Sequence, residues 1–214
     1  MRKKVSISMG WDIEIIKKDE LKVNSWSGGT TTQLAIYPKN AIYSERNFKW
    51  RLSSAKVEVD ESDFTFLPGI NRIIMIIEGE LILEHEGHHK SILKPFAQDR
   101  FSGSWKTRSY GKVIDFNLMT SEDCEGKLEA MGILKGKTRK IIFDKDFDKF
   151  SYETQAIYCV NGQAKINSPN NEACTLNKGD IILITLKDDF CQQDFTIYND
   201  NEIELKLIKA TLKY

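Results

Sequence analysis

The sequence predicts an all-β protein with an internal duplication, and three observations support this fold class. Along most of the 214 residues, short apolar or alternating stretches are separated by turn residues. Segments with the 3.6-residue period of an amphipathic helix are few, and the only windows of helix length are weak ones around residues 122–134. A faint repeat relates two strand-glycine-strand units at a constant spacing, which matches Gly79 to Gly162 and Leu93 to Leu176. This pattern is typical of a duplicated β-barrel.

Each expected strand is an apolar or alternating run that ends at turn residues. The strands are expected at residues 31–37, 48–59, 72–84, 112–119, 155–166, 181–186 and 202–207. In the last run, Ile203, Leu205 and Leu207 alternate with charged residues, as in a strand with one buried face. Residues 125–136 are expected to form a solvated connector. The expected domains are therefore residues 1–122 and residues 123–214.

The charge balance argues against polyanion binding. The chain has 31 Lys and Arg residues against 31 Asp and Glu residues, so no net field attracts nucleic acid or an anionic membrane. Its longest aliphatic run, residues 73–77, is too short to cross a bilayer, and no cleavage site follows the basic start. Four cysteines without a C-x-x-C pair are expected to be reduced and mostly buried: Cys124, Cys159, Cys174 and Cys191. We therefore expect a cytoplasmic protein without nucleic-acid or membrane partners.

Four sequence blocks in a fixed order carry a family resemblance. They are residues 26–34 (WSGGTTTQL), 50–55 (WRLSSA), 64–72 (FTFLPGINR) and 115–119 (DFNLM). These blocks resemble the HutD/Ves family of two-barrel cupins. The resemblance implies a bicupin, with two cupin-like jelly-roll β-barrels in one chain and the family motifs in the first. Two positions depart from the family pattern: Ser62-Asp63 stands where a glycine often precedes the Phe, and Ser104 stands where an acid is common.

The same resemblance implies a function without metal or cofactor. Proteins similar to HutD/Ves are expected to bind a small carboxylate, such as formylglutamate, in an accessory or regulatory role in histidine utilisation or a stress response. Two alternatives stay open. A metal-free cupin isomerase would need an acid/base pair in the cavity, and a structural or protein-binding bicupin would have a filled barrel. No residue is assigned a catalytic role, and the oligomeric state is not fixed by the sequence.

Polar residues on the expected strands are the candidate ligand contacts. Arg51 and Ser53 share one face of residues 48–55, and Asp115 and Asn117 share one face of residues 113–119. If these faces turn inward, arginine forks, hydroxyls and an amide converge on a carboxylate. The expected ligand-binding set is Arg72, Arg51, Ser53, Thr30, Thr32, Asn117 and Asp115. The alternatives are that these faces point to water, that Asp115 neutralises an arginine, and that Arg72 forms a salt bridge at the barrel rim.

The metal positions of metal-binding cupins are occupied by other residues. Counting back from Gly79 places Arg72 at the position of the metal-binding Glu, and Phe66 and Pro68 at those of the two His. The second half has Gln155, Ser151 and Lys149 at these places. A 2-His-1-carboxylate site is therefore not expected in either barrel.

All three histidines lie in residues 85–89, which spell H-E-x-x-H. That motif binds zinc on a helix, where residues four apart share a face. Here the flanks are strand-like and Gly87 lies in the middle, so we expect a hairpin tip in which His85, His88 and His89 are solvated. No metal site is predicted. Motifs for a serine hydrolase, a phosphate loop or a dinucleotide fold are also missing from the sequence.

Overall fold

The structure is a computed structural model that describes residues 3–7, 11–143, 149–169, 172–187 and 194–214. These residues form β-strands and two short 3-10 helices, η1 (Lys18–Glu20) and η2 (Tyr43–Glu45). No helix among them has the length and apolarity that a membrane crossing requires. The all-β prediction is confirmed. The chain divides into two compact units, which we call the central unit (Leu21–Gly126) and the terminal unit (Met1–Glu20 together with Lys127–Tyr214).

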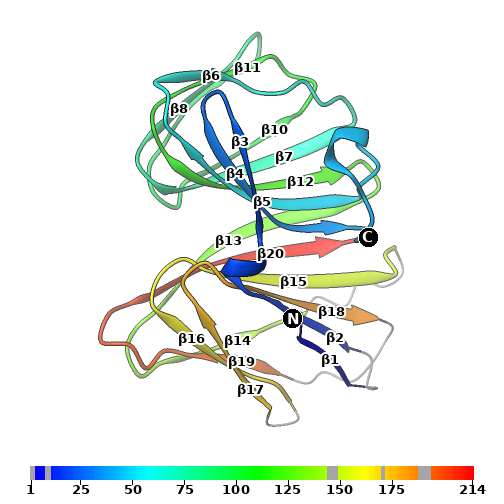
Figure 1. Ribbon diagram of the computed structural model, residues 1–214, viewed down its shortest axis with the longest axis vertical. Helices are drawn as coiled ribbons and strands as arrows, with labels where there is room; N and C mark the ends of the chain where they lie inside the picture. The colour runs from blue at the N-terminus through cyan, green and yellow to red at the C-terminus, as the bar shows by residue number, and fades with distance from the viewer. Residues whose placement is uncertain (1–2, 8–10, 144–148, 170–171, 188–193) are drawn as a thin grey trace. The chain divides into compact units, whose positions relative to one another are not determined.

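The central unit contains two antiparallel sheets (Figure 1). The six-stranded sheet has the order β10-β7-β12-β5-β4-β3 and the four-stranded sheet has the order β6-β11-β8-β9. Apolar side chains of β7 and β8, including Ile74, Ile76 and Leu83, pack together with Phe101 between the sheets. The strands are β3 (Lys22–Trp26), β4 (Gly29–Tyr37), β5 (Trp50–Val57), β6 (Glu61–Asp63), β7 (Ile70–Glu78), β8 (Leu81–His85), β9 (Lys90–Leu93), β10 (Gln98–Ser102), β11 (Thr107–Tyr110) and β12 (Ile114–Ser121).

The terminal unit repeats this arrangement. Its six-stranded sheet has the order β1-β2-β18-β15-β20-β13, and its four-stranded sheet has the order β14-β19-β16-β17. A core that includes Ile157, Ile184 and Phe195 fills the space between them. The strands are β1 (Lys3–Ile7), β2 (Trp11–Ile16), β13 (Glu125–Ile133), β14 (Thr138–Ile141), β15 (Tyr152–Cys159), β16 (Gln163–Asn167), β17 (Ala173–Asn177), β18 (Ile181–Lys187), β19 (Phe195–Tyr198) and β20 (Leu205–Lys213). In the described residues, each unit is a pair of sheets rather than one closed barrel.

The division of the chain differs from the expected domains 1–122 and 123–214. The first 20 residues belong with the C-terminal half, because β2 pairs with β18 along its whole length. Trp11 of β2 joins the core of the terminal unit, and Ile13 packs against it. Trp11, Ile13 and Ile15 of β2 alternate with Asp12 and Glu14, but the sequence does not reveal that this strand pairs with one from the C-terminal half.

Two expected long strands are each divided by a glycine. The run at residues 72–84 forms β7 and β8, with Gly79 between them at a φ of 89°, and residues 155–166 form β15 and β16 around Gly162 at 62°. Such values favour glycine because a Cβ is crowded there. The expected connector at residues 125–136 is instead largely β13. Its Leu128, Met131 and Ile133 are buried, although their spacing is not a strict two-residue alternation.

The glycine between β7 and β8 provides a stability prediction. A Cβ at Gly79 would lie 2.5 Å from the carbonyl oxygen of Lys112, whereas a Cβ at Gly87, also at positive φ, meets nothing within 4 Å. Gly87→Ala should therefore cost about 1 kcal/mol, from the backbone conformation alone. Gly79→Ala should cost at least about 2 kcal/mol more, because the backbone must also move. Denaturant unfolding of both variants measures the difference, and equal losses would contradict the crowding at Gly79.

Candidate functional site

The described residues of the central unit surround a cavity of about 410 Å³, a volume that suits a small molecule. Both sheets contribute to its wall. Strands β5, β7 and β12 provide charged and amide side chains, and β6 and β11 provide the hydroxyls of Ser62 and Ser109. Five of the seven residues expected to contact a ligand line this cavity: Arg51, Ser53, Arg72, Asp115 and Asn117.

Strand register places the two arginines in one row of the six-stranded sheet. Met119 of β12 is paired with Arg51 of β5 on one side and with Arg72 of β7 on the other. Asn117 and Asp115 follow at two-residue steps along β12, so they lie on the same face. The sheet thus directs two guanidinium groups, an amide and a carboxyl group toward one space.

Arg72 is buried, and no described residue serves as its hydrogen-bonded counter-ion. Its side chain lies over the rings of Phe64 and Phe101, at 4.6 and 5.2 Å from the ring centroids, and only 5% of the residue is exposed. Its Nε has no hydrogen-bond partner among the described residues. Burial lowers the pKa of Arg72 to about 10, so the group is still a cation at neutral pH. The alternative of a salt bridge at the rim does not fit these contacts.

Arg51 is held in place by its neighbours. Its Nε donates to Oε1 of Gln33 and its Nη1 donates to Oγ of Ser53, both at 3.0 Å. The guanidinium also lies 4.3 Å from the ring centroid of Tyr43. Burial lowers the pKa of Arg51. Ser53, expected to contact a ligand, therefore orients Arg51. The sequence analysis did not include Gln33 among the candidate residues. It lies in the first family block and is paired with Ser53 in the β4–β5 register.

Asp115 and Asn117 are buried polar groups with few partners. Oδ1 of Asp115 accepts a hydrogen bond from the backbone N–H of Ala55 at 3.1 Å. Burial raises the pKa of Asp115 to about 7, although this hydrogen bond and the charge of Arg72 act in the opposite direction. Oδ1 of Asn117 has no hydrogen-bond partner in the described part of the chain. The cavity therefore contains an unpaired acceptor close to two cations.

Thr30 and Thr32 do not line the cavity, and Thr31 does. Thr31 is paired with Ala55 and Thr32 with Ser54, so Thr31 shares the face of the cavity residues of β5. Because side chains alternate along a strand, Thr30 and Thr32 point to the opposite face. The prediction was displaced by one residue, and a bulge between Gln33 and Ala35 hides the correct phase from a simple count.

The histidines lie at a hairpin end, as expected, but they are not all solvated. Strand β8 ends at His85 and β9 begins at Lys90, with Gly87 at positive φ between them. His85 is only 3% exposed and lies within hydrogen-bonding distance of Thr107 and Asp99. Its burial comes from packing against Trp105 and Phe101, which the local sequence does not reveal.

Comparison with known families gives an assignment. A sequence model of the HutD family matches residues 18–204. The chain belongs to the HutD family. This confirms the HutD resemblance of the four sequence blocks, and the match extends well beyond them into the terminal unit of this HutD-family protein.

Several solved structures share the fold of this HutD-family chain. A conserved protein of unknown function from Pseudomonas aeruginosa has a TM-score of 0.76 at 18% identity, covering 94% of this chain and 99% of that one. HutD from Pseudomonas fluorescens, in a formate condition, has a TM-score of 0.65 at 19% identity, with coverages of 94% and 100%. The pirin YhhW from Escherichia coli, in complex with nickel(II), has a TM-score of 0.65 at 10% identity, with coverages of 92% and 98%. The similarity to pirin indicates a cupin-like all-β fold.

The raised pKa of Asp115 predicts a pH dependence of stability. Between about pH 4 and 7 the folded protein holds the Asp115 proton and the unfolded chain does not. The stabilising contribution of the protonated carboxyl is therefore complete below pH 4 and is lost as the pH rises through 7. Relative to Asp115→Asn, the wild type should lose about 2–4 kcal/mol over this range. Denaturant unfolding of both proteins from pH 4 to 8 measures this loss. If the difference in their free energies of unfolding stayed constant over that range, the pKa of Asp115 would not be raised.

Proposed function

We propose that this HutD-family protein binds a small carboxylate in the cavity of the central unit, without a metal. The observation that carries the proposal is the buried guanidinium of Arg72, whose Nε finds no hydrogen-bond partner in the part of the chain that the structure describes. An unsatisfied buried donor costs about 1–3 kcal/mol and more when charged, and a bound carboxylate would remove that cost.

The partners of the two arginines suggest different roles. Arg51 already donates to Gln33 and Ser53, so its orientation is fixed before a ligand arrives. Within the described ranges, Nε of Arg72 has no such bond, and the guanidinium lies over Phe64 and Phe101, which leaves its fork for the ligand. In this proposal Arg72 pairs with the carboxylate and Arg51 adds positive charge from the same row of the sheet.

The free acceptor of Asn117 narrows the ligand class. Its Oδ1 needs a hydrogen-bond donor, which a plain fatty acid lacks and an N-acyl amino acid provides through its amide N–H. Formylglutamate carries carboxylates and such an N–H, and it is small enough for a cavity of about 410 Å³. Formate, named with the P. fluorescens HutD structure, is the smallest carboxylate probe for the Arg72 end.

The proposed role is accessory or regulatory in histidine utilisation, in keeping with the family. The protein would then sense or buffer a metabolite in the cytoplasm, where the free thiols of Cys124, Cys159 and Cys174 would stay reduced. Cys191 lies outside the described residues. We also interpret the two units as duplicated cupin domains, since each pairs a six-stranded sheet with a four-stranded one.

One observation favours acid–base catalysis as a second candidate. Asp115 is buried in the cavity with a pKa of about 7, which suits a group that exchanges protons at neutral pH. An isomerase of keto acids or sugars could use it once Arg72 holds the substrate. The cavity itself argues against the third candidate, a filled structural domain.

The binding proposal predicts a specific loss of affinity in Arg72→Met. Methionine keeps the contact with Phe64 and Phe101 and removes the charge and the donors. We expect calorimetric titration of the wild type with formylglutamate to show one site, and Arg72→Met to weaken it at least 100-fold, about 3 kcal/mol.

The matched control is Arg139→Met, which removes an exposed arginine of the terminal unit that pairs with Glu129 at 3.1 Å. It should bind like the wild type. Equal affinity of wild type and Arg72→Met for formylglutamate, glutamate and formate, or no heat with any of them, would refute the carboxylate site.

The catalytic alternative predicts proton exchange that depends on Asp115. In D₂O, the protein would exchange the C–H protons of 2-oxoglutarate next to its keto group faster than buffer alone. NMR measures this rate, and Asp115→Asn should return it to the buffer rate while keeping the ligand bound to Arg72. If the wild type exchanged these protons no faster than buffer, with keto acids and with sugars, the catalytic alternative would be wrong and binding would remain the proposed function.

A further inference from the structure

A second polar cluster lies outside the cavity, where the two sheets of the central unit meet. Its centre is Asp99 on β10, the edge strand of the six-stranded sheet, and it faces the β8–β9 hairpin of the four-stranded sheet. Oδ2 of Asp99 accepts a hydrogen bond from Ser91 Oγ at 2.6 Å and lies 3.2 Å from His85 Nε2 and 3.0 Å from His89 Nε2. Two imidazole nitrogens thus converge on one carboxylate.

The second ring nitrogen of His85 also has a hydrogen-bonding partner, which fixes the orientation of the ring. Its Nδ1 lies 2.8 Å from Oγ1 of Thr107, and that hydroxyl donates to the carbonyl oxygen of Trp105 at 3.4 Å. The hydroxyl oxygen can therefore accept a hydrogen bond from Nδ1–H, and in that tautomer the lone pair of Nε2 is directed at Asp99. Metal-binding histidines are commonly oriented in this way through their second nitrogen.

The ring of His85 is enclosed by its neighbours. Its side chain is 0% exposed and lies between Asp99 on one side and Thr107 on the other. With the ring proton on Nδ1, Nε2 of His85 and Oδ2 of Asp99 are two acceptors 3.2 Å apart. A cation between them could bind to both atoms.

We propose that His85, His89 and Asp99 form a binding site for a divalent transition metal such as Zn²⁺. Their ligand atoms all lie within 4.8 Å of one another. In a tetrahedral zinc site with bonds of about 2.0–2.1 Å, ligand atoms are roughly 3.3 Å apart, so shifts of a few tenths of an ångström would suffice at Asp99. Two imidazoles and one carboxylate favour zinc, nickel or copper over magnesium or calcium.

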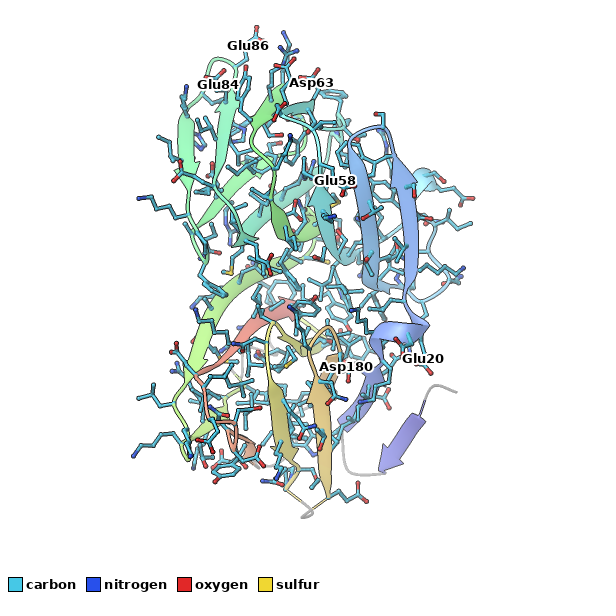
Figure 2. The ribbon with its side chains drawn as sticks, turned by 60° about the vertical axis from the view of Figure 1, so that its left-hand side comes forward. Glu20, Glu58, Asp63, Glu84, Glu86 and Asp180 are labelled. Atoms are coloured by element: carbon cyan, nitrogen blue, oxygen red, sulfur yellow. The ribbon has the colours of Figure 1, made fainter. Side chains whose placement is uncertain are left out.

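The site would keep one position open. The side chain of His89 is 40% exposed and that of Asp99 is 11% exposed, so water or an exogenous ligand can reach the fourth position. The charged residues around the hairpin end are paired elsewhere: Glu84 with Lys90, and Glu86 with Lys106. Figure 2 shows Glu86 at the outer end of this hairpin, and we do not include it among the ligands.

This metal site is separate from the carboxylate cavity. The ring of Phe101 lies between them, with its centroid 4.6 Å from that of His85 and 5.2 Å from the guanidinium carbon of Arg72. It also differs from the metal positions of cupins, which Phe66, Pro68 and Arg72 occupy here. The two proposals therefore stand independently and can be tested in the same protein.

The test is zinc binding by the full chain after treatment with EDTA. A chromophoric chelator competes for Zn²⁺, and the residual affinity is measured for the wild type, His89→Gln, Asp99→Asn and Thr107→Val. The control is His88→Gln. His88 belongs to the same hairpin as His85 and His89 but is not part of the cluster, and its ring stacks on that of Trp105 with the centroids 3.8 Å apart. Circular dichroism checks that each variant is folded.

We expect one Zn²⁺ per chain in the wild type and in His88→Gln. Affinity should fall at least 100-fold in His89→Gln and Asp99→Asn, and about 10–100-fold in Thr107→Val, where only the orientation of His85 is lost. Wild-type protein without saturable zinc binding would overturn the proposal. Binding that survives His89→Gln unchanged, or that falls equally in His88→Gln, would overturn it as well, because the metal would then be bound by other groups such as the free cysteines.

Discussion

The central constraint of this structure is the removal of a guanidinium from water with no counter-ion bonded to it among the described residues. Arg72 lies over the faces of two aromatic rings, and the charge of Arg51 opposes its own. Cation–π contacts of this kind contribute about 0.5–2 kcal/mol each, less than the cost of desolvating an ion. The two guanidinium groups make the cavity a region of positive potential. Burial nevertheless raises the pKa of Asp115, because desolvation outweighs the charge of Arg72.

Regular antiparallel pairing is what concentrates these groups. Three neighbouring strands, β5, β12 and β7, place Arg51, Met119 and Arg72 in one row, and the next rows on the same face hold Asn117 and Asp115. Apolar residues of these strands occupy the other face, where Leu52 and Phe116 are fully buried. A single-residue slip of β12 would exchange the two sets, so the apolar face fixes the register of the polar one.

The sequence predicted the all-β fold class and several polar residues of the cavity wall, because both depend on two-residue alternation. Arg51, Ser53, Asp115 and Asn117 were found in this way. Alternation does not reveal absolute phase across a bulge, and so Thr30 and Thr32 were chosen in place of Thr31. Long-range packing was also invisible: the burial of His85 depends on Trp105 and on the edge strand that carries Asp99, neither of which is adjacent to it in the chain.

The grouping of the first 20 residues with the C-terminal half affects the order in which the protein can be completed during synthesis. The central unit is continuous in the chain, so all of its strands have left the ribosome before most of the terminal unit has been translated. Strand β2 emerges early, but its neighbour β18 is made more than 160 residues later. Until then its apolar side chains lack their partners on β18, and a nascent chain would depend on chaperones to avoid pairing with the wrong strand.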